Sequence, residues 1–349
     1  MPKNNYFCLI MAGGVGRRFW PCSRKALPKQ FLDFFGMGKS FLRMTYDRYR
    51  QIVPEENIYV STHVDYRELV TNIIPELKGN RLICEDERRN TAPAITYAMR
   101  VISRDNPEAT VVVAPCDHLI LKDDEFRESI LRGLDFASRY DKLLTIGIRP
   151  GRPETGYGYI QVGERDENEL DFYKVKTFIE RPAREFAEMF VQSNEFFWNS
   201  GIFLWSIKTI ERALAEHTNN ISQFTDREDP DFASCPNISI DFSLLEKADN
   251  VYVQICDFGW AHLNTWESLY EAAPKDRGGN VVLNCNTLLY DCRNNVIALP
   301  KGKLAVLQGL EGFLVAISGD VLLVCRKDDQ NAIRKFINDV EMRFGEKFS

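Results

Sequence analysis

Near its start the chain reads Phe7-Cys8-Leu9-Ile10-Met11-Ala12-Gly13-Gly14-Val15-Gly16-Arg17-Arg18, and a little further on Pro28-Lys29-Gln30-Phe31. The short apolar run at residues 7–11 predicts a buried strand. The glycines after it let backbone N–H groups approach phosphate oxygens without interference from Cβ atoms, and the nearby cations balance phosphate charge. This stretch therefore predicts a strand that leads into a phosphate-binding loop.

Strands alternate with helices around this loop. Further short apolar runs predict buried strands at Ile58–Ser61, Leu82–Glu85, Thr110–Ala114 and Leu143–Ile148. Helix-length stretches lie between them at Ser40–Gln51, Ala92–Ser103 and Asp123–Tyr140. The alternation is typical of an α/β protein with a Rossmann-like, mostly parallel sheet that helices cover on both faces. Ligands of such sheets bind beyond the C-terminal ends of the strands, where the glycine loop falls.

The pattern changes further along the chain. From about residue 150, polar loops carry aromatic clusters at Thr155–Tyr159 and Phe196–Gly201, which suits a substrate-binding half built onto the same sheet. After Pro274, short apolar runs between residues 281 and 325 predict strands, and Asp328–Phe344 predicts an amphipathic helix. We expect a main domain over residues 1–275 and a small β-rich accessory domain over residues 280–349, ending in that helix.

The composition narrows the classes of function. A net charge of -6 argues against general binding to nucleic acid or to anionic membranes, so a phosphate site must be a local cluster of cations. No apolar run approaches the roughly 20 residues that span a bilayer, and the first residues lack the pattern of a secretory leader. The nine cysteines form no C-x-x-C pair and are typical of reduced thiols. We expect a cytoplasmic protein without nucleic-acid or membrane partners.

Three interpretations of the glycine loop compete. Gly14-Val15-Gly16 supplies half of the dinucleotide-binding fingerprint, but Phe19 stands where its third glycine or alanine belongs. A P-loop requires a different glycine spacing and a Lys-Ser/Thr pair. The remaining alternative is a plain glycine turn that leads into a helix.

The wider motif resembles a known family. The residues Gly13-Gly14-x-Gly16-x-Arg18-x-x-Pro21, Ser23-Arg24 and Pro28-Lys29-Gln30-Phe31 resemble the signature of the sugar-nucleotide nucleotidylyltransferases, in detail that of the mannose-1-phosphate guanylyltransferases. The similarity continues through Glu85–Ala94, Pro115–His118, Thr155–Ile160, Phe178–Pro182, Trp198–Phe203 and Ser239–Phe242. It implies a nucleotide-diphospho-sugar transferase fold with its catalytic domain over residues 1–275. GTP and mannose 1-phosphate would be the substrates and GDP-mannose and pyrophosphate the products; the resemblance is also compatible with a homodimer.

The resemblance also assigns catalytic residues. The attacking sugar phosphate is already an anion, so the reaction needs positioning and charge neutralisation more than a general base. Arg18 is expected on the β- and γ-phosphates, Lys29 between the phosphates of the two substrates, and Asp117 on Mg²⁺. The alternatives are a solvated surface cation for Arg18 or Lys29 and a capping role for Asp117.

The binding residues follow from the same motifs. The expected nucleotide-binding residues are Ala12, Gly13, Gly14, Gly16, Glu85, Asn90 and Thr91. The expected sugar-binding residues are Gly158, Glu180 and Asn199, of which Glu180 and Asn199 would bond sugar hydroxyls. The alternative for Glu180 is a surface ion pair with Arg181.

One position departs from the family pattern. The family has W-S-D-[aliphatic]-G-[ST]-W where this chain reads Trp260-Ala261-His262-Leu263-Asn264-Thr265-Trp266, so His262 replaces the second metal-binding carboxylate. Imidazole is a poor ligand for Mg²⁺ and a better one for softer ions. Asp117 and phosphates would then hold Mg²⁺ alone, or the site prefers Mn²⁺, Co²⁺ or a related ion, or catalysis is lost. Alternative functions are the same chemistry on another sugar 1-phosphate or nucleotide, and a weakened regulatory paralogue that binds GDP-mannose.

Overall fold

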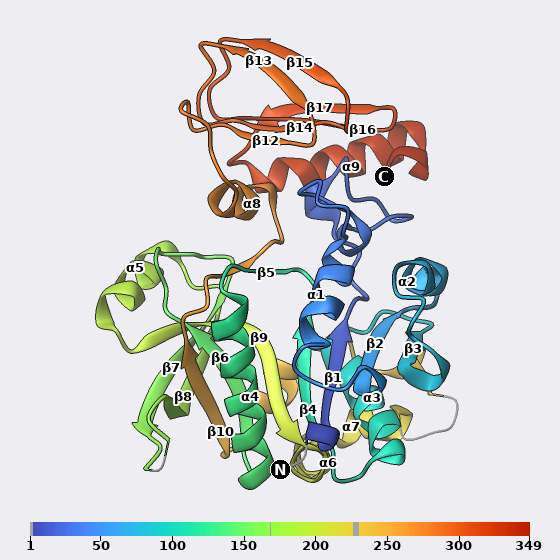
Figure 1. The fold of residues 1–349 in the computed structure, drawn as a ribbon, viewed down its shortest axis with the longest axis vertical. Coiled ribbons are helices and arrows are strands. Elements are labelled where there is room, and N and C mark those ends of the chain that lie inside the picture. The colour runs from blue at the N-terminus through green and yellow to red at the C-terminus, as the bar shows by residue number, and fades with distance from the viewer. Residues whose placement is uncertain (1–2, 168, 226–229) are drawn as a thin grey trace. The chain divides into compact units, whose positions relative to one another are not determined.

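The computed structural model describes residues 3–167, 169–225 and 230–349 (Figure 1). They form two compact units, each assembled from separate segments. Unit 1 contains the residues up to Gly13 with residues 46–115 and 120–260, and unit 2 contains residues 14–45, 116–119 and 261–349. The glycine loop therefore groups mainly with the C-terminal part of the chain. The predicted boundary between a main domain and an accessory domain, near residues 275–280, does not coincide with the boundaries of these units. The two predicted domains stay a prediction.

Unit 1 is built on a sheet whose described strands number nine, in the order β3-β2-β1-β4-β9-β6-β10-β8-β7. The strands are β1 (Tyr6–Met11), β2 (Ile58–His63), β3 (Leu82–Glu85), β4 (Thr110–Pro115), β6 (Leu143–Ile148), β7 (Gly158–Arg165), β8 (Phe172–Glu180), β9 (Phe196–Ser206) and β10 (Val251–Cys256). β1 is parallel to β2 and β4, and β6 is parallel to β10. The predicted α/β sheet is confirmed, and strands β1 to β4 and β6 lie where the apolar runs predict them. The pairing is parallel from β3 to β4 and between β6 and β10, and antiparallel where β9, β8 and β7 pair with their neighbours.

Strand β9 corrects one prediction. The sequence predicts a polar loop at residues 196–201, but these residues form the first half of β9, which runs antiparallel to β4, β6 and β7. Asn199-Ser200-Gly201 is typical of a turn in sequence. In the structure Gly201 adopts a positive φ of 71° within the strand, and the pairing with β6 shifts register between Thr145 and Gly147. Such irregularities admit turn-like residues into a central strand.

Helices cover both faces of this sheet. The helices that lie in unit 1 are α2 (Arg67–Ile73), α3 (Thr91–Asp105), α4 (Asp123–Arg139), α5 (Arg184–Ser193), α6 (Ile207–His217) and α7 (Asn219–Thr225), while α1 (Phe41–Tyr49) continues from unit 2 into unit 1. Figure 1 shows α4 crossing in front of the sheet. A Cβ on Gly133 of α4 would lie 3.1 Å from Leu204 of β9 and 3.2 Å from Leu144 of β6, so glycine permits this close approach. The helices predicted over residues 40–51, 92–103 and 123–140 are confirmed.

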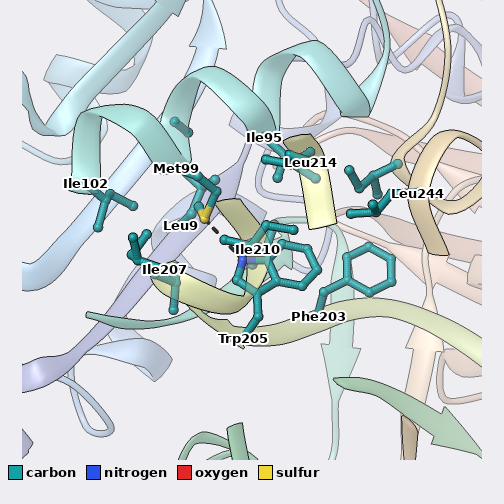
Figure 2. Close-up of a cluster of buried hydrophobic side chains, with 14 of the residues drawn as sticks. Leu9, Ile95, Met99, Ile102, Phe203, Trp205, Ile207, Ile210, Leu214 and Leu244 are labelled. Atoms are coloured by element: carbon teal, nitrogen blue, oxygen red, sulfur yellow. Dashed lines mark hydrogen bonds between the residues drawn. The ribbon is translucent and has the colours of Figure 1, made fainter. Parts of the chain in front are cut away.

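The core on the opposite face is centred on Trp205. Figure 2 shows this side chain of β9 packed among residues of α3 and α6, with Nε1 donating to Sδ of Met99 at 3.1 Å. Phe203 of β9 and Leu9 of β1 belong to the same buried cluster. Because alternate residues of a strand point to opposite faces, Leu204 lies on the side that α4 covers. This two-sided burial explains why the central strands β1 and β4 are apolar along almost their whole length.

Unit 2 combines the glycine loop with the C-terminal strands. Its strands are β12 (Val281–Leu283), β13 (Asn286–Tyr290), β14 (Val296–Ala298), β15 (Leu304–Gln308), β16 (Phe313–Ser318) and β17 (Val321–Arg326), and its helices are α8 (Trp266–Ala272) and α9 (Gln330–Phe344). They form a four-stranded sheet β12-β14-β16-β17 and a pair β13-β15. Phe19 and Phe34 from the N-terminal segment share one buried cluster with Trp266 of α8 and Ile337 of α9. The predicted β-rich region and its closing helix are confirmed.

Two short strands connect the units along the chain. β5 (His118–Ile120) pairs with β11 (Trp260–His262), and each runs from one unit into the other. In unit 2 the backbone N–H of Leu263 donates to the carbonyl of Asp117 at 3.0 Å. Among the described residues, no helix combines the length and the apolar character that crossing a membrane requires.

The Trp205 core gives a matched test of burial. Leu214 of α6 is 4% exposed and Leu170 is 67% exposed. We expect Leu214→Ala to lower the free energy of unfolding by about 3 kcal/mol through lost burial and a residual cavity. The control Leu170→Ala should change it by less than about 0.5 kcal/mol. Urea denaturation followed by tryptophan fluorescence measures both values, and equal losses would contradict the assignment of this core.

Candidate active site

The glycine loop leaves β1 and enters a short 3-10 turn. The backbone N–H of Ala12 donates to Ser61 at 2.8 Å, and Thr62 donates to the Ala12 carbonyl at 3.0 Å, which fixes the start of the loop in unit 1. Gly16 has a φ of 64°, and a Cβ there would lie 2.9 Å from both Lys29 and Ser23, so its fold requires glycine. The turn at Arg17–Phe19 follows, and the next α-helix begins only at Phe41. The dinucleotide fingerprint and the plain turn into a helix are therefore both wrong.

Phe19 explains why the third fingerprint glycine is missing. Its ring is fully buried and packs against Phe34 with centroids 4.8 Å apart and against Trp266 at 5.1 Å. The residue thus holds the loop in the core of unit 2, where a glycine would leave a void. Arg18, the next residue toward the loop, is half-buried in the same turn.

Lys29 is buried, so the alternative of a solvated surface cation is wrong for this residue. Its side chain is 10% exposed, and Nζ lies 2.6 Å from Oδ2 of Asp117 and donates to the Leu263 carbonyl at 2.9 Å. Its backbone N–H donates to Oγ of Ser23 at 2.9 Å, which fixes the position of the chain after Pro28. The ammonium group is therefore held in one place by two oxygen acceptors.

Asp117 follows β4, as the sequence predicts, and lies at the centre of a charged cluster in unit 2. Its Oδ2 also contacts Nε2 of His262 at 3.1 Å. Burial alone would raise the pKa of this carboxyl, but Lys29 and then His262 outweigh it and hold the pKa well below its usual range. Asp117 is therefore a carboxylate with two cationic or polar partners. It is not limited to capping a turn.

The same cluster fits a divalent metal ion. Asp117, His118 and His262 each offer one ligand atom, and these atoms all lie within 4.8 Å of one another. The rings of His118 and His262 have centroids 5.4 Å apart. One carboxylate with two imidazoles suits Mn²⁺, Co²⁺ or Zn²⁺ better than Mg²⁺, which prefers oxygen ligands. Sequence reasoning missed His118, although its position directly after Asp117 is a usable signal.

Glu85 lies in unit 1 beside the first glycine of the loop. It ends β3, is 6% exposed and accepts a hydrogen bond from Ser61 at 2.9 Å. A Cβ on Gly13 would lie 3.9 Å from Oε1 of Glu85. Burial raises the pKa of Glu85 to about 7, and the Ser61 hydrogen bond and the charge of Arg88 oppose this shift. Arg88 also donates to the Gly13 carbonyl at 3.3 Å and is a residue that the motif comparison missed.

Asn90 and Thr91 have local structural roles at the start of α3. Oδ1 of Asn90 accepts a hydrogen bond from the backbone N–H of Thr91 at 2.9 Å, which caps the helix, and Asn90 has a φ of 68°. Oγ1 of Thr91 accepts from the backbone N–H of Ile240 at 2.9 Å. A nucleotide-binding role for either residue stays a prediction.

The three predicted sugar-binding residues lie together in unit 1. Gly158 of β7 pairs in register with Glu180 of β8, and a Cβ on Gly158 would lie 2.7 Å from Oε1 of Glu180 and 3.6 Å from Cβ of Asn199. Oδ1 of Asn199 accepts from Thr145 at 3.1 Å, and its Nδ2 donates to Asp241 at 2.8 Å.

Asp241 is a further acidic group at this position. Burial raises its pKa to about 6; the Asn199 hydrogen bond lowers the value and the charge of Glu180 raises it. The motif Ser239–Phe242 is the sequence signal that points to Asp241, although the sequence alone assigns it no role. The carboxylates of Asp241 and Glu180 with the Asn199 amide are suited to bonding several hydroxyl groups.

The candidate residues thus divide between the units. Unit 2 holds Gly14, Gly16, Arg18, Lys29, Asp117 and His262. Unit 1 holds Ala12, Gly13, Glu85, Asn90, Thr91, Gly158, Glu180 and Asn199. The groups suited to phosphate and metal lie mostly in unit 2, and those suited to hydrogen bonding of uncharged ligand parts lie in unit 1.

The comparisons with known proteins define the family to which the chain belongs. The chain belongs to the nucleotidyl transferase family, whose model matches residues 7–278. It is 31% identical to mannose-1-phosphate guanylyltransferase of Escherichia coli, over 96% of this chain and 75% of that protein, and 33% identical to the enzyme of the same name from Klebsiella pneumoniae, over 94% and 72%. A solved structure from Thermus thermophilus, described as a mannose-1-phosphate geranyltransferase, matches with a TM-score of 0.87 and 30% identity, over 97% of this chain and 99% of that one. The resemblance to the mannose-1-phosphate guanylyltransferases is confirmed.

The buried ion pair gives a second matched test. Lys29→Met leaves the Asp117 carboxylate without its closest cation, which should lower the free energy of unfolding by about 3 kcal/mol. Lys25 forms an exposed pair with Glu346 at 3.2 Å, and the same change there should cost less than about 1 kcal/mol. Chemical denaturation measures both, and Asp117→Asn added to Lys29→Met should recover part of the loss. A loss at Lys29 no larger than at Lys25 would refute the buried pair.

Proposed function

We propose that this protein joins GTP and mannose 1-phosphate to give GDP-mannose and pyrophosphate, with the aid of a divalent metal ion. The observation that carries the proposal is the partly buried cluster of Lys29, Asp117 and His262 in the unit that holds most of the glycine loop. It supplies fixed positive charge and metal ligands, the needs of phosphoryl chemistry. The names of the relatives support the choice of GTP and mannose 1-phosphate.

The chemistry requires little proton transfer. An oxygen of the sugar phosphate forms a bond to the α-phosphorus of GTP, and the bond from that phosphorus to the bridging oxygen breaks. Pyrophosphate leaves with the electron pair, so negative charge grows on the β- and γ-phosphates. In this proposal Arg18 binds those phosphates, and Lys29 neutralises charge shared between the two substrates. A divalent ion held by Asp117 would supply further charge neutralisation.

The glycines support a ligand at the loop. Gly16 is required by the fold itself, because its positive φ and its neighbours exclude a side chain. A Cβ on Gly14 would meet no described atom within 4 Å, so packing does not require glycine there. A phosphate that approaches the backbone closely would explain why position 14 is glycine.

We assign base and sugar recognition to the unit 1 residues. An ionised Glu85 can accept the two adjacent N–H groups of guanine, and its raised pKa makes this ability strongest above about pH 7. Glu180 and Asn199 would bond mannose hydroxyls, with Gly158 leaving room for the sugar. We also propose that the enzyme works in the cytoplasm, in keeping with its nine free cysteines, and as a homodimer, which light scattering checks.

The metal preference is the part of this proposal most specific to the chain. Mg²⁺ is the ion expected from the family resemblance, but His262 and His118 offer nitrogen ligands beside Asp117. We propose that Mn²⁺ or Co²⁺ binds this site more tightly than Mg²⁺. The presence of His262 also favours a second candidate function, a weakened paralogue that binds GDP-mannose without efficient turnover.

Activity and substrate choice are tested together. We expect pyrophosphate release only when GTP and mannose 1-phosphate are both present, in a panel of four nucleoside triphosphates against mannose, glucose and fucose 1-phosphates. Arg18→Ala should lower kcat/KM by at least about a hundredfold, because charge on the leaving pyrophosphate loses its partner. Arg17→Ala is the control, since Arg17 is half-exposed and pairs with Glu341 at 3.6 Å. Preference for another pair, or equal effects of the two variants, would contradict the assignments.

The metal proposal has its own test in His262→Asp. Titration of the metal-free protein should show Mn²⁺ and Co²⁺ binding at least about tenfold more tightly than Mg²⁺, and bound Co²⁺ should show the visible absorption of nitrogen ligation. His262→Asp should reduce this preference and raise the rate in Mg²⁺, since it restores an oxygen ligand. Tighter Mg²⁺ binding in the wild type would refute the proposal. Good native turnover in Mg²⁺ with no gain in the variant would remove the weakened-paralogue alternative.

A further inference from the structure

Two residues of the glycine-loop segment reach away from the loop toward the C-terminal part of unit 2. Nε1 of Trp20 donates to the carbonyl of Phe348 at 2.7 Å. Nη2 of Arg24 donates to the carbonyl of Ser318 at 2.6 Å. The partners lie 328 and 294 positions away along the chain, so these contacts are built by the fold and not by local sequence. We call these four residues the C-terminal clasp.

Arg24 is fully engaged within the protein. Its Nε donates to the Pro21 carbonyl at 3.1 Å, and its Nη1 lies 3.6 Å from Oδ1 of Asp320. Each nitrogen of the guanidinium therefore has a partner in unit 2, and the side chain is only 18% exposed. The planar fork holds the turn between β16 and β17 against the segment that follows the glycine loop. This arrangement does not suit a phosphate-binding cation.

Trp20 joins the C-terminal segment to the part of the chain that carries His262. Its side chain is 4% exposed, and its carbonyl accepts a hydrogen bond from Nε1 of Trp266 at 3.1 Å. Trp266 begins α8 directly after the segment that contains His262 and Leu263. Buried hydrogen bonds of this kind are costly to break, because each leaves an unsatisfied polar group.

The exposed contacts of the same segment contribute less. Arg17 pairs with Glu341 and Lys25 pairs with Glu346, but three of the four side chains are at least half exposed. Such pairs are worth little because water and salt screen them. The position of the segment therefore depends on the C-terminal clasp, whose two hydrogen bonds are partly buried, and Lys25 offers a matched control for Arg24.

We propose that the C-terminal clasp holds the glycine loop in the conformation that binds the triphosphate, with Arg24 and Trp20 as positioning residues. The proposal rests on the proposed function. A loop rich in glycine loses much conformational freedom when it is ordered. If the folded protein orders the loop beforehand, the ligand does not bear that cost. Displacement of the C-terminal segment would then weaken triphosphate binding without any change in the residues that contact phosphate.

The test compares Arg24→Gln with Lys25→Gln in the full chain. We expect Arg24→Gln to weaken GTP binding by about tenfold in calorimetry without turnover, the size of one or two lost hydrogen bonds, and to leave mannose 1-phosphate binding unchanged. Amide hydrogen exchange should become faster over residues 14–31 and stay the same in the Trp205 core. Arg24→Lys should recover part of the effect, since one donor can still reach Ser318. Lys25→Gln should match the wild type.

A second variant guards against misfolding of the first. Trp20→Phe keeps a buried ring but removes the donor to Phe348, and it should produce the same local pattern. Equal loss of both substrates, faster exchange along the whole chain, or identical results for Arg24→Gln and Lys25→Gln would overturn the positioning role. If the wild type binds neither substrate, the proposed function fails. Exchange over residues 14–31 still decides whether the clasp orders the loop.

Discussion

The contact between Nζ of Lys29 and Oδ2 of Asp117, at 2.6 Å, is the interaction on which the arrangement of unit 2 depends. Neither charge could be buried alone at acceptable cost, so each fixes the other. Lys29 also bonds the Leu263 carbonyl, and Asp117 also contacts His262. Within unit 2 the pair therefore connects three segments that are distant in sequence: residues 14–31, residues 116–119 and the residues that precede α8. The proposed site for polyanions would gain from such rigidity, because its charges would need no reorganisation when substrate binds.

Glycine and aromatic residues of the loop also fix the structure of unit 2, glycine by leaving space for a neighbour and phenylalanine by filling space in the core. Gly16 is needed because its positive φ and the closeness of Lys29 exclude a side chain. Phe19, three residues later, fills a pocket beside Phe34 and Trp266. The loop therefore has no side chain at Gly16, where Lys29 packs against it, and a large aromatic side chain at Phe19, where the core has to be filled. The proposed chemistry and the stability of unit 2 consequently depend on the same short segment, which limits the substitutions that this segment can accept.

Much of the fold follows from sequence periodicity, and much of the site follows from motifs. Strands β1 to β4 and β6 and the helices α1, α3 and α4 were predictable because apolar runs and helical faces are local signals. Strand β9 was not, since Asn199-Ser200-Gly201 has the composition of a turn and only the neighbouring strands make it extended. The structural role of Arg24 could not be predicted for a similar reason, because its partners Ser318 and Asp320 are remote in sequence. Asp241 and His118 needed three-dimensional proximity before a role could be assigned.

The replacement of a carboxylate by His262 changes the electrostatics of the site more than its shape. A second carboxylate beside Asp117 would compete for Lys29 and would repel phosphate. With imidazole there, Asp117 keeps Lys29 as its closest cation, and the local charge is more positive than two carboxylates would make it. Such a site favours binding of triphosphate and pyrophosphate, both strong polyanions. It also gives the metal fewer oxygen ligands, which disfavours Mg²⁺ in particular. In the proposed reaction, tight product binding with a weakly held hard metal would slow turnover through pyrophosphate release, so the substitution that helps to bind the substrate would also limit the rate.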